Sequence, residues 1–292
     1  MDTSPDELPA DQQTAILAER YSERAETYDA LWSPVIRPAG ERLLGHLPLA
    51  RAKNIVDVGA GSGALLPLIQ KASPSATVLG VDNSEGMLRL AKDKHPGPLA
   101  LMDVQKLELD DNQFDVAVVA FVLFHLPRPD WCLAEVNRVL RPGGVVGTVT
   151  WGAEHVPAAE TIWNEELEAS GAPGLGLPAV DNRGCCNSVE KVAALLAEAG
   201  FGTTRTWTEP IHHQWRPEDF FDYQLRSGAG LRLRSIPPHE RDSCVRRVRD
   251  RLSRQGEGGL VFTGELVMAT AVKADVARIP LPDRAIRETG EK

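Results

Sequence analysis

The chain has 292 residues, enough for one α/β domain with a sizeable insertion and a core that needs no covalent staples. Lys and Arg number 32 against 41 Asp and Glu, giving a formal net charge of -9 that argues against nucleic-acid or anionic-membrane binding through bulk charge. The longest apolar run, residues 116–126, is too short to span a bilayer. The four cysteines show no zinc spacing, so we expect free thiols, no metal and a cytoplasmic protein.

The N-terminal region is predicted to be helical. Residues 1–10 are acidic and contain proline, and we interpret them as a disordered leader. Apolar side chains at helical spacing then predict a helix over residues 11–30, which Pro34 ends. A second helix is expected over residues 35–45.

From residue 54 onward, short apolar strands alternate with helices. The predicted strands cover residues 54–58, 77–81, 99–102, 114–120 and 145–151. The predicted helices cover residues 64–72, 84–92 and 130–140, with Ser84 as an N-cap. This alternation over about 100 residues is typical of a parallel, doubly wound sheet with both faces covered.

The alternation breaks after residue 151. Further helices are predicted over residues 158–170, 188–199, 217–225 and 238–255, and further strands over residues 203–213 and 260–272. We interpret residues 153–187 and 216–255 as helical cap insertions and the charged residues 274–292 as a flexible tail.

A glycine-rich turn follows the first predicted strand and opens the next helix. It runs Asp57-Val58-Gly59-Ala60-Gly61-Ser62-Gly63. Glycines let the backbone come close to a ligand and leave the helix N-terminus free to donate N–H groups. The turn alone is ambiguous, because Gly59, Gly61 and Ala64 also match the dinucleotide-binding fingerprint.

Three carboxylates at strand ends separate the two kinds of ligand. Asp57 precedes the first glycine by two residues, Asp82 ends the second strand, and Asp103 follows the third. The carboxyl ends of parallel strands lie along one crevice, so these side chains should line it together. Such a crevice fits a cationic, amine-bearing nucleoside better than a pyrophosphate. Each Asp alone is more often a turn or cap residue, but the three together favour a ligand site.

With these motifs the chain resembles the class I S-adenosylmethionine-dependent methyltransferases, especially the small-molecule branch that includes ubiquinone/menaquinone and natural-product methyltransferases. The matching motifs are residues 56–63, 80–88, 103–104, 114–119 and 135–144, within residues 21–151. The resemblance implies a Rossmann-like seven-stranded sheet whose last strand is antiparallel, in a methyltransferase domain over residues 11–273. It also implies that residues 11–48 form an N-terminal helical lid.

The resemblance further implies S-adenosyl-L-methionine as the cofactor. The glycine loop would hold its methionine part, with Asp57 near the amino group, and Asp82 would hold the ribose. Asp103, the Val104 N–H and Met87 would meet the adenine. The full set of implied cofactor residues is Tyr21, Asp57, Gly59, Ala60, Gly61, Gly63, Asp82, Asn83, Met87, Asp103, Val104, Ala120 and Phe121.

Methyl transfer needs an aligned nucleophile and a site without water, and a general base only when the nucleophile carries a proton. His125, after the fourth strand, and His155, after the fifth, are the candidate bases, since histidine titrates near neutral pH. A purely structural role in the Phe-His-Leu-Pro turn is the alternative for His125.

Aromatic residues are the candidates for an acceptor-binding wall, which would suit an apolar or aromatic acceptor. They are Tyr28, Trp32, Trp151, Trp163, Trp215 and Tyr223. Ordinary core packing is the alternative for each of them.

The predicted function is therefore methyl transfer from S-adenosylmethionine to an oxygen, nitrogen or carbon of a small molecule. No nucleic-acid or membrane partner is expected, and a homodimer is left open. An NAD-dependent oxidoreductase is the first alternative, but it does not account for Asp57 or Asp103. A non-catalytic S-adenosylmethionine-binding protein is the second.

Overall fold

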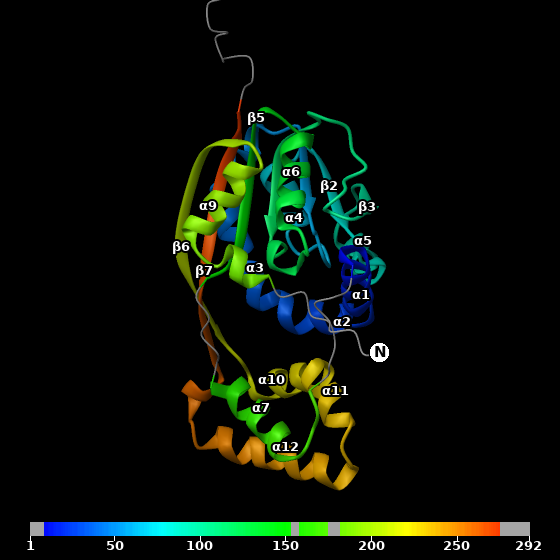
Figure 1. Ribbon diagram of the computed structural model, residues 1–292, viewed down its shortest axis with the longest axis vertical. Coiled ribbons are helices and arrows are strands. Elements are labelled where there is room, and N and C mark those ends of the chain that lie inside the picture. The colour runs from blue at the N-terminus through cyan, green and yellow to red at the C-terminus, as the bar shows by residue number, and fades with distance from the viewer. Residues whose placement is uncertain (1–8, 153–157, 175–181, 275–292) are drawn as a thin grey trace, which may run out of the picture.

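The computed structural model describes residues 9–152, 158–174 and 182–274. Its centre is a seven-stranded sheet in the order β3-β2-β1-β4-β5-β7-β6 (Figure 1). The strands are β1 (Asn54–Val58), β2 (Thr77–Asp82), β3 (Leu99–Leu101), β4 (Phe114–Ala120), β5 (Leu140–Trp151), β6 (Phe201–Gln214) and β7 (Val261–Lys273). Strand β7 runs antiparallel to β5 and β6, and the other pairs are parallel. The predicted seven-stranded, doubly wound α/β fold is confirmed.

The helices that pack on the sheet follow the predicted local signals. They are α3 (Ser33–Leu44), α4 (Leu66–Ala72), α5 (Glu85–Lys94), α6 (Pro129–Val139) and α9 (Val189–Glu198). Ser84 caps α5 by accepting a hydrogen bond from the Met87 N–H at 3.3 Å. The central strands are apolar along their length because both faces are covered, and β4 residues Val116 to Val119 are at most 1% exposed.

The N-terminal helices differ from the prediction. Helix α1 (Ala10–Glu23) breaks at Arg24, and the chain continues through α2 (Ala25–Thr27) and the π-helix η2 (Tyr28–Trp32) directly into α3. The prediction of one helix ended by Pro34 is wrong. Pro34 lies in the first turn of α3, where a missing N–H leaves no hydrogen bond unmade.

A helical lobe lies beyond the carboxyl edge of the sheet, at the bottom of Figure 1. It consists of α7 (Ala158–Ala169), α10 (Pro217–Arg226), α11 (Gly228–Arg234) and α12 (Pro238–Ser253). Glu166 links α7 to α12, because its carboxylate accepts hydrogen bonds from Arg247 and Arg251 of α12 at 2.6 and 3.0 Å. The long strands β6 and β7 connect this lobe to the sheet.

Parts of the predicted boundaries lie outside the described residues. These are most of the leader, residues 175–181, the tail from residue 275, and residues 153–157, which include His155. Within the described ranges, the lobe contains the predicted helices together with α11, and the short helix α8 (Arg183–Cys186) was also not predicted. Among the helices of these ranges, none is long and apolar enough to cross a membrane.

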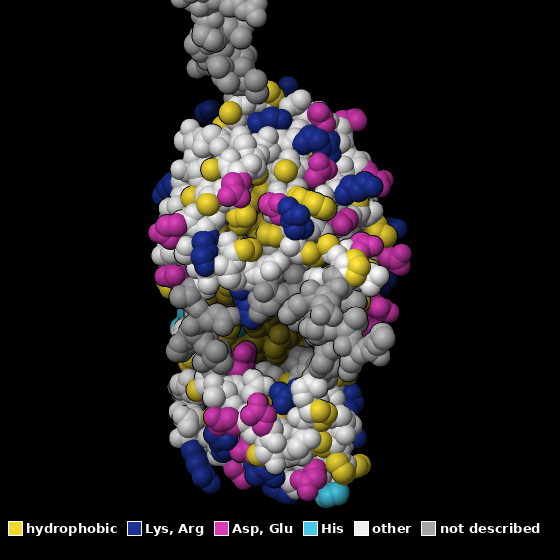
Figure 2. Space-filling view, viewed as in Figure 1, with side chains coloured by type: hydrophobic (Ala, Val, Ile, Leu, Met, Phe, Trp, Pro, Cys, Tyr) yellow, Lys and Arg dark blue, Asp and Glu magenta, His cyan; other side chains and the backbone are white. Residues whose placement is uncertain are grey.

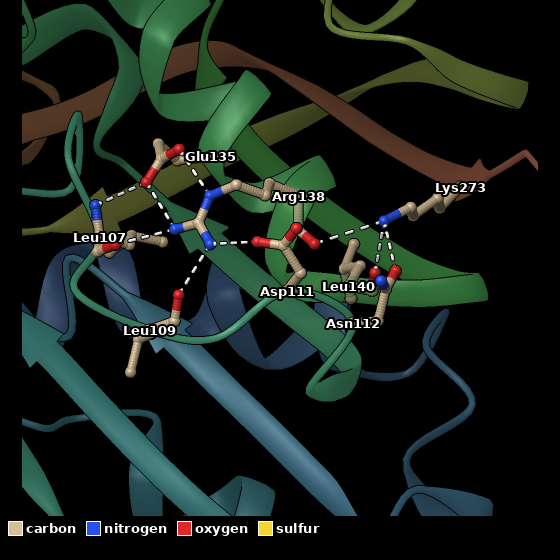
Figure 3. Close-up of polar contacts among 8 residues, drawn as sticks. All are labelled: Leu107, Leu109, Asp111, Asn112, Glu135, Arg138, Leu140 and Lys273. Carbon is tan, nitrogen blue, oxygen red and sulfur yellow. Dashed lines mark hydrogen bonds and ion pairs between the residues drawn. The ribbon is translucent and has the colours of Figure 1, made fainter.

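Arg138 of α6 anchors the loop between β3 and β4 (Figure 3). This loop contains Asp103 and Val104. Its guanidinium donates to the carbonyl oxygens of Leu107 and Leu109 at 2.8 and 2.7 Å. It also forms ion pairs with the carboxylates of Glu135 and Asp111. Lys273, at the end of β7, donates to the Asn112 side chain and the Leu140 carbonyl in the same region. These contacts hold the part of the loop that follows Val104, a residue that lines the site described next.

Candidate active site

The glycine loop after β1 is held in a conformation that requires glycine. Gly59, Gly61 and Gly63 have φ angles of 76°, 54° and 78°. The Gly59 N–H donates to the Val81 carbonyl at 2.8 Å, and the Gly61 N–H donates to the Asp82 carboxylate at 2.8 Å. A Cβ at Gly59 would come within 2.3 Å of a methyl group of Val122, so the loop has no room for another residue type there.

Two cavities of about 90 and 60 Å³ flank this loop, and we call them together the loop groove. The predicted cofactor residues that line it are Tyr21, Asp57, Gly59, Ala60, Gly61, Asp82, Asn83, Met87, Val104, Ala120 and Phe121. Gly63 lies against Ala91 of α5, where a Cβ would come within 2.8 Å. Asp103 accepts hydrogen bonds from the backbone and side chain of Gln105 at 2.9 and 3.3 Å.

The buried carboxylate of Asp57 and the partly buried carboxylate of Asp82 give the loop groove its electrostatic character. Burial, with a smaller contribution from Asp82, raises the pKa of Asp57 to about 7, and the Asp57 residue is 2% exposed. Burial also raises the pKa of Asp82, although the N–H groups of Gly61 and Ser84 donate to it and partly offset this effect. Paired buried carboxylates are stabilised by a cationic ligand and destabilised by an anionic one.

Polar contacts fasten the N-terminal helices over this groove. The Ser62 hydroxyl of the glycine loop donates to the Asp29 carboxylate of η2 at 2.6 Å, and Lys94 of α5 forms an ion pair with Asp29. The Ser22 hydroxyl of α1 lies 2.8 Å from that of Ser84. The segment predicted as a lid is therefore docked on the loop and on the start of α5.

A larger cavity of about 350 Å³, the aromatic cavity, lies between the sheet and the helical lobe. In Figure 2 a hollow with hydrophobic side chains at its floor separates the two parts of the molecule. The predicted acceptor residues Tyr28, Trp32, Trp151 and Tyr223 line this cavity. The Trp32 and Tyr223 rings stack at a centroid distance of 5.4 Å and an interplanar angle of 14°.

The two remaining predicted acceptor residues, Trp215 and Trp163, do not line the aromatic cavity. Trp215 stacks on Tyr223 at 5.6 Å and on Trp32 at 6.4 Å. Trp163 is 1% exposed inside the helical lobe, where it packs against Phe220 and Phe221. Its surroundings are those of a core residue of the lobe.

Phe121 joins the groove to the aromatic cavity at the end of β4. It lines both, and its ring lies 5.0 Å from the ring of Trp151. Its φ angle of 59° is in the left-handed region, which is strained for a residue with a bulky side chain. This backbone conformation turns the chain sharply and places Phe121 where the loop groove and the aromatic cavity meet.

Tyr21 and His125 form a hydrogen-bonded pair at the same meeting point. The Tyr21 hydroxyl lies 2.8 Å from Nε2 of His125, and both residues line the groove and the aromatic cavity. Burial raises the pKa of Tyr21 above its ordinary value, so the side chain is a neutral phenol at physiological pH. His125 is carried by the 3₁₀ turn η4 (Leu123–His125), against which α8 docks through hydrogen bonds from Asn182.

The comparisons with known proteins agree with this geometry. Residues 56–147 match the sequence family described as a methyltransferase domain. These residues therefore form a methyltransferase domain, and the sheet around them has the class I methyltransferase fold. The ubiquinone/menaquinone biosynthesis C-methyltransferase UbiE of Burkholderia mallei is 41% identical over 99 residues, and that of Cupriavidus metallidurans is 37% identical over 100 residues. In each case the match covers 32% of this chain and 41% of the relative, so it spans less than half of the relative's length.

Solved structures show that the methyltransferase fold extends over most of the chain. A chain in the complex of the Haloferax volcanii Trm112 methyltransferase activator with a methyltransferase has a TM-score of 0.56 at 17% identity, covering 87% of this chain and 98% of that one. The [4+2]-cyclase SpnF has a TM-score of 0.56 at 15% identity, covering 89% of this chain and 96% of that one. At such identities the likeness concerns the fold alone.

Three arginines of the aromatic cavity were missed in the sequence. They are Arg20 of α1, Arg24 directly after α1, and Arg183 of α8. The spacing of Arg20 and Arg24 places both on one face of a helix, together with Leu17 and Tyr21. This shared helical face was the sequence signal that could have placed the two arginines at the cavity. The break of α1 at Arg24 and the short helix α8 were not visible in the sequence pattern.

Replacing Asp57 by Asn should stabilise the ligand-free methyltransferase domain. The pKa of Asp57 rises from its ordinary 3.8 to about 7 on folding, so the folded state binds the extra proton and stability falls as the pH rises through this window. The amide removes that loss, which amounts to roughly 1.4 kcal/mol for each pH unit between the two pKa values. Urea unfolding at pH 5 and pH 8 should show a gain that is larger at pH 8.

Asp115→Asn is the matched control at the opposite end of the sheet. Burial alone would raise the pKa of Asp115, but the N–H groups of Asn54 and Lys53 and the Arg141 guanidinium together lower it. Its carboxylate therefore stabilises the fold above its unfolded pKa, and this contribution is lost in acid. Asp115→Asn should destabilise the protein at pH 8. A gain for Asp57→Asn that does not change with pH, or a loss, would contradict the electrostatic character assigned to the groove.

Proposed function

We propose that the protein transfers the methyl group of S-adenosyl-L-methionine to a small molecule held in the aromatic cavity. The observation that carries the proposal is that the loop groove and the aromatic cavity share one wall, formed by Tyr21, Tyr28, Phe121 and His125. A cofactor in the groove and an acceptor in the cavity would meet there, as methyl transfer requires.

The groove residues fit this cofactor. Asp57 would accept from its amino group, and the open space beside the Gly61 backbone, where a Cβ would meet no atom within 4 Å, leaves room for its methionine part. Asp82 would accept from the ribose hydroxyls, because each carboxylate oxygen has a further lone pair besides the one used by a backbone N–H. Val104 and Met87 would border the adenine. A pyrophosphate would place its charges against Asp57 and Asp82, which argues against the NAD-dependent alternative.

When bound, S-adenosylmethionine would supply an activated methyl group on a sulfonium. The residues of this chain would cover the groove and move a proton. The N-terminal helices, held by the Asp29 contacts, would cover the groove and exclude water from it. In the proposed step, the acceptor's hydroxyl or amine loses its proton to the Tyr21 oxygen while the Tyr21 proton passes to Nε2 of His125. The cofactor, when bound, would supply the methyl group, and the proton would remain on His125. On a phenol or quinol methylated at carbon, the phenolate formed in this way would accept the methyl group on a ring carbon, and the C–H proton of that carbon would then return to the oxygen as the ring becomes aromatic again.

The acceptor itself is proposed from the cavity. Stacked Trp32 and Tyr223, with Trp151 beside them, suit a planar ring. The relatives of Burkholderia and Cupriavidus are named C-methyltransferases of quinone biosynthesis, so a phenol or quinol methylated on carbon is the first acceptor class to test. A cytoplasmic location and a homodimer stay predictions.

Calorimetric titration tests the cofactor. S-adenosylmethionine should bind in the micromolar range, and NAD should not bind comparably. Asp82→Ala should weaken binding by at least ~1–3 kcal/mol, the cost of removing a charged partner. The control Asp222→Ala, at an exposed ion pair of α10 with Arg226, should leave the affinity unchanged. Wild-type affinity should fall below pH 7 as Asp57 is protonated. Tight NAD binding without S-adenosylmethionine binding would refute the proposal.

Tyr21→Phe and His125→Gln test the proton path, with tritium-labelled S-adenosylmethionine and a panel of phenols, quinols and amines. Both substitutions should lower kcat by ~10²–10⁴-fold, the usual contribution of a general base, while cofactor affinity stays within about tenfold. His239→Gln, at an exposed residue of α12, is the control. If kcat and its pH profile were unchanged in both variants, Tyr21 and His125 would not transfer the proton and their role would be structural. Tight cofactor binding with no transfer to any acceptor would favour the non-catalytic alternative.

A further inference from the structure

The aromatic cavity has a cationic end that methyl transfer alone does not need. Arg20, Arg24 and Arg183 line it, and its described lining contains no Asp or Glu. This is unusual in a chain whose formal net charge is -9. An arginine cluster facing a cavity favours an anionic ligand, because the planar guanidinium binds carboxylates in a bidentate manner.

Arg24 is the central residue of this cluster. Its Nε donates to the Arg20 carbonyl at 3.3 Å, and among the described residues no carboxylate forms an ion pair with it. Arg24 also lines a neighbouring cavity of about 170 Å³ together with Arg226. The charge of Arg226 is already balanced, because it forms an ion pair with Asp222 at 2.7 Å. Of Arg24 and Arg226, Arg24 is therefore the residue whose positive charge an anionic ligand would balance.

The electrostatics of α1 point the same way. Burial and the like charge of Arg24 lower the pKa of Arg20, and Glu23 opposes them. Two guanidiniums one helical turn apart at a partly buried wall repel each other, and a bound anion would relieve this repulsion. Another carboxylate in the region is Glu160 of α7, which raises the pKa of Tyr223 together with burial. It is absent from the lining of the aromatic cavity.

The cavity is therefore bipolar. Trp32, Trp151 and Tyr223 provide an aromatic part, Arg20 and Arg24 a cationic part, and Tyr21 with His125 a wall shared with the loop groove. A cavity of about 350 Å³ is at the small end of ligand sites and suits one or two fused rings.

We infer that the acceptor is an aromatic acid, with its carboxylate on Arg20 and Arg24 and its ring between the cavity's aromatic side chains. This inference rests on the proposed function, because it names the substrate class of the same site. Arg20 and Arg24 are then specificity-determining residues, which contact the acceptor and do not contact the cofactor.

The test compares naphthoate with naphthamide, two probes of nearly equal shape that differ in charge. Each is titrated calorimetrically into the protein saturated with S-adenosylhomocysteine. The wild type should bind naphthoate at least tenfold more tightly than naphthamide. Arg24→Gln and Arg20→Gln should reduce this ratio to within about twofold of unity while naphthamide affinity changes little. Arg24→Lys should retain part of the preference, since charge remains but the fork geometry is lost.

Arg246→Gln, at an exposed arginine on α12 that binds Ser243, is the matched control and should keep the full preference. Circular dichroism and S-adenosylhomocysteine affinity show that each variant is folded. A wild type that binds S-adenosylhomocysteine but prefers naphthamide, binds both probes equally or binds neither overturns the inference alone. A wild type that does not bind S-adenosylhomocysteine overturns the proposed function instead.

Discussion

The carboxylate of Asp82 accepts hydrogen bonds from the backbone N–H groups of Gly61 and Ser84 at 2.8 and 2.9 Å, and the geometry of the site depends on this pair of contacts. One side chain thereby fixes the glycine loop relative to the start of α5. The arrangement places a partly buried carboxylate at the end of β2. The neighbouring Asp57 makes this electrostatically costly, and the groove is therefore less stable empty than it would be with a cation bound.

The break in the N-terminal helix is the second constraint. Because α1 ends at Glu23 and the chain passes through η2, Tyr21 and Arg24 face the cavities while Trp32 reaches the aromatic stack next to the lobe. π-Helical turns are rare and are frequently found at functional sites. Here the turn also positions Asp29 for its contacts with the glycine loop, so the docking of the N-terminal helices and the lining of the aromatic cavity have one structural origin.

The parts of the fold with strong local signals could be predicted from the sequence. Strands β1 and β4 have the predicted limits, since each consists mainly of apolar residues and β1 is ended by the glycine-rich turn. Ser84 and Ser188 cap the predicted helices. The groove was also predictable, because parallel strands bring their carboxyl ends to one edge whatever the tertiary packing.

What could not be predicted depends on contacts between segments far apart in sequence. The break at Arg24 is accompanied by polar contacts of the N-terminal helices with Ser62 and Ser84, and spacing along the helix gives no sign of them. Trp163 and Trp32 are both tryptophans near predicted helices, yet one fills the core of the lobe and the other lines the cavity. Aromatic composition alone does not separate these roles.

A crystal structure of the protein with S-adenosylhomocysteine bound tests the proposed site most directly. We expect the amino group of the ligand beside Asp57, the ribose hydroxyls at Asp82, and the sulfur directed toward the wall shared by Tyr21, Phe121 and His125. A ligand bound outside the loop groove, or bound in it with the sulfur turned away from the aromatic cavity, would contradict the proposed arrangement of cofactor and acceptor.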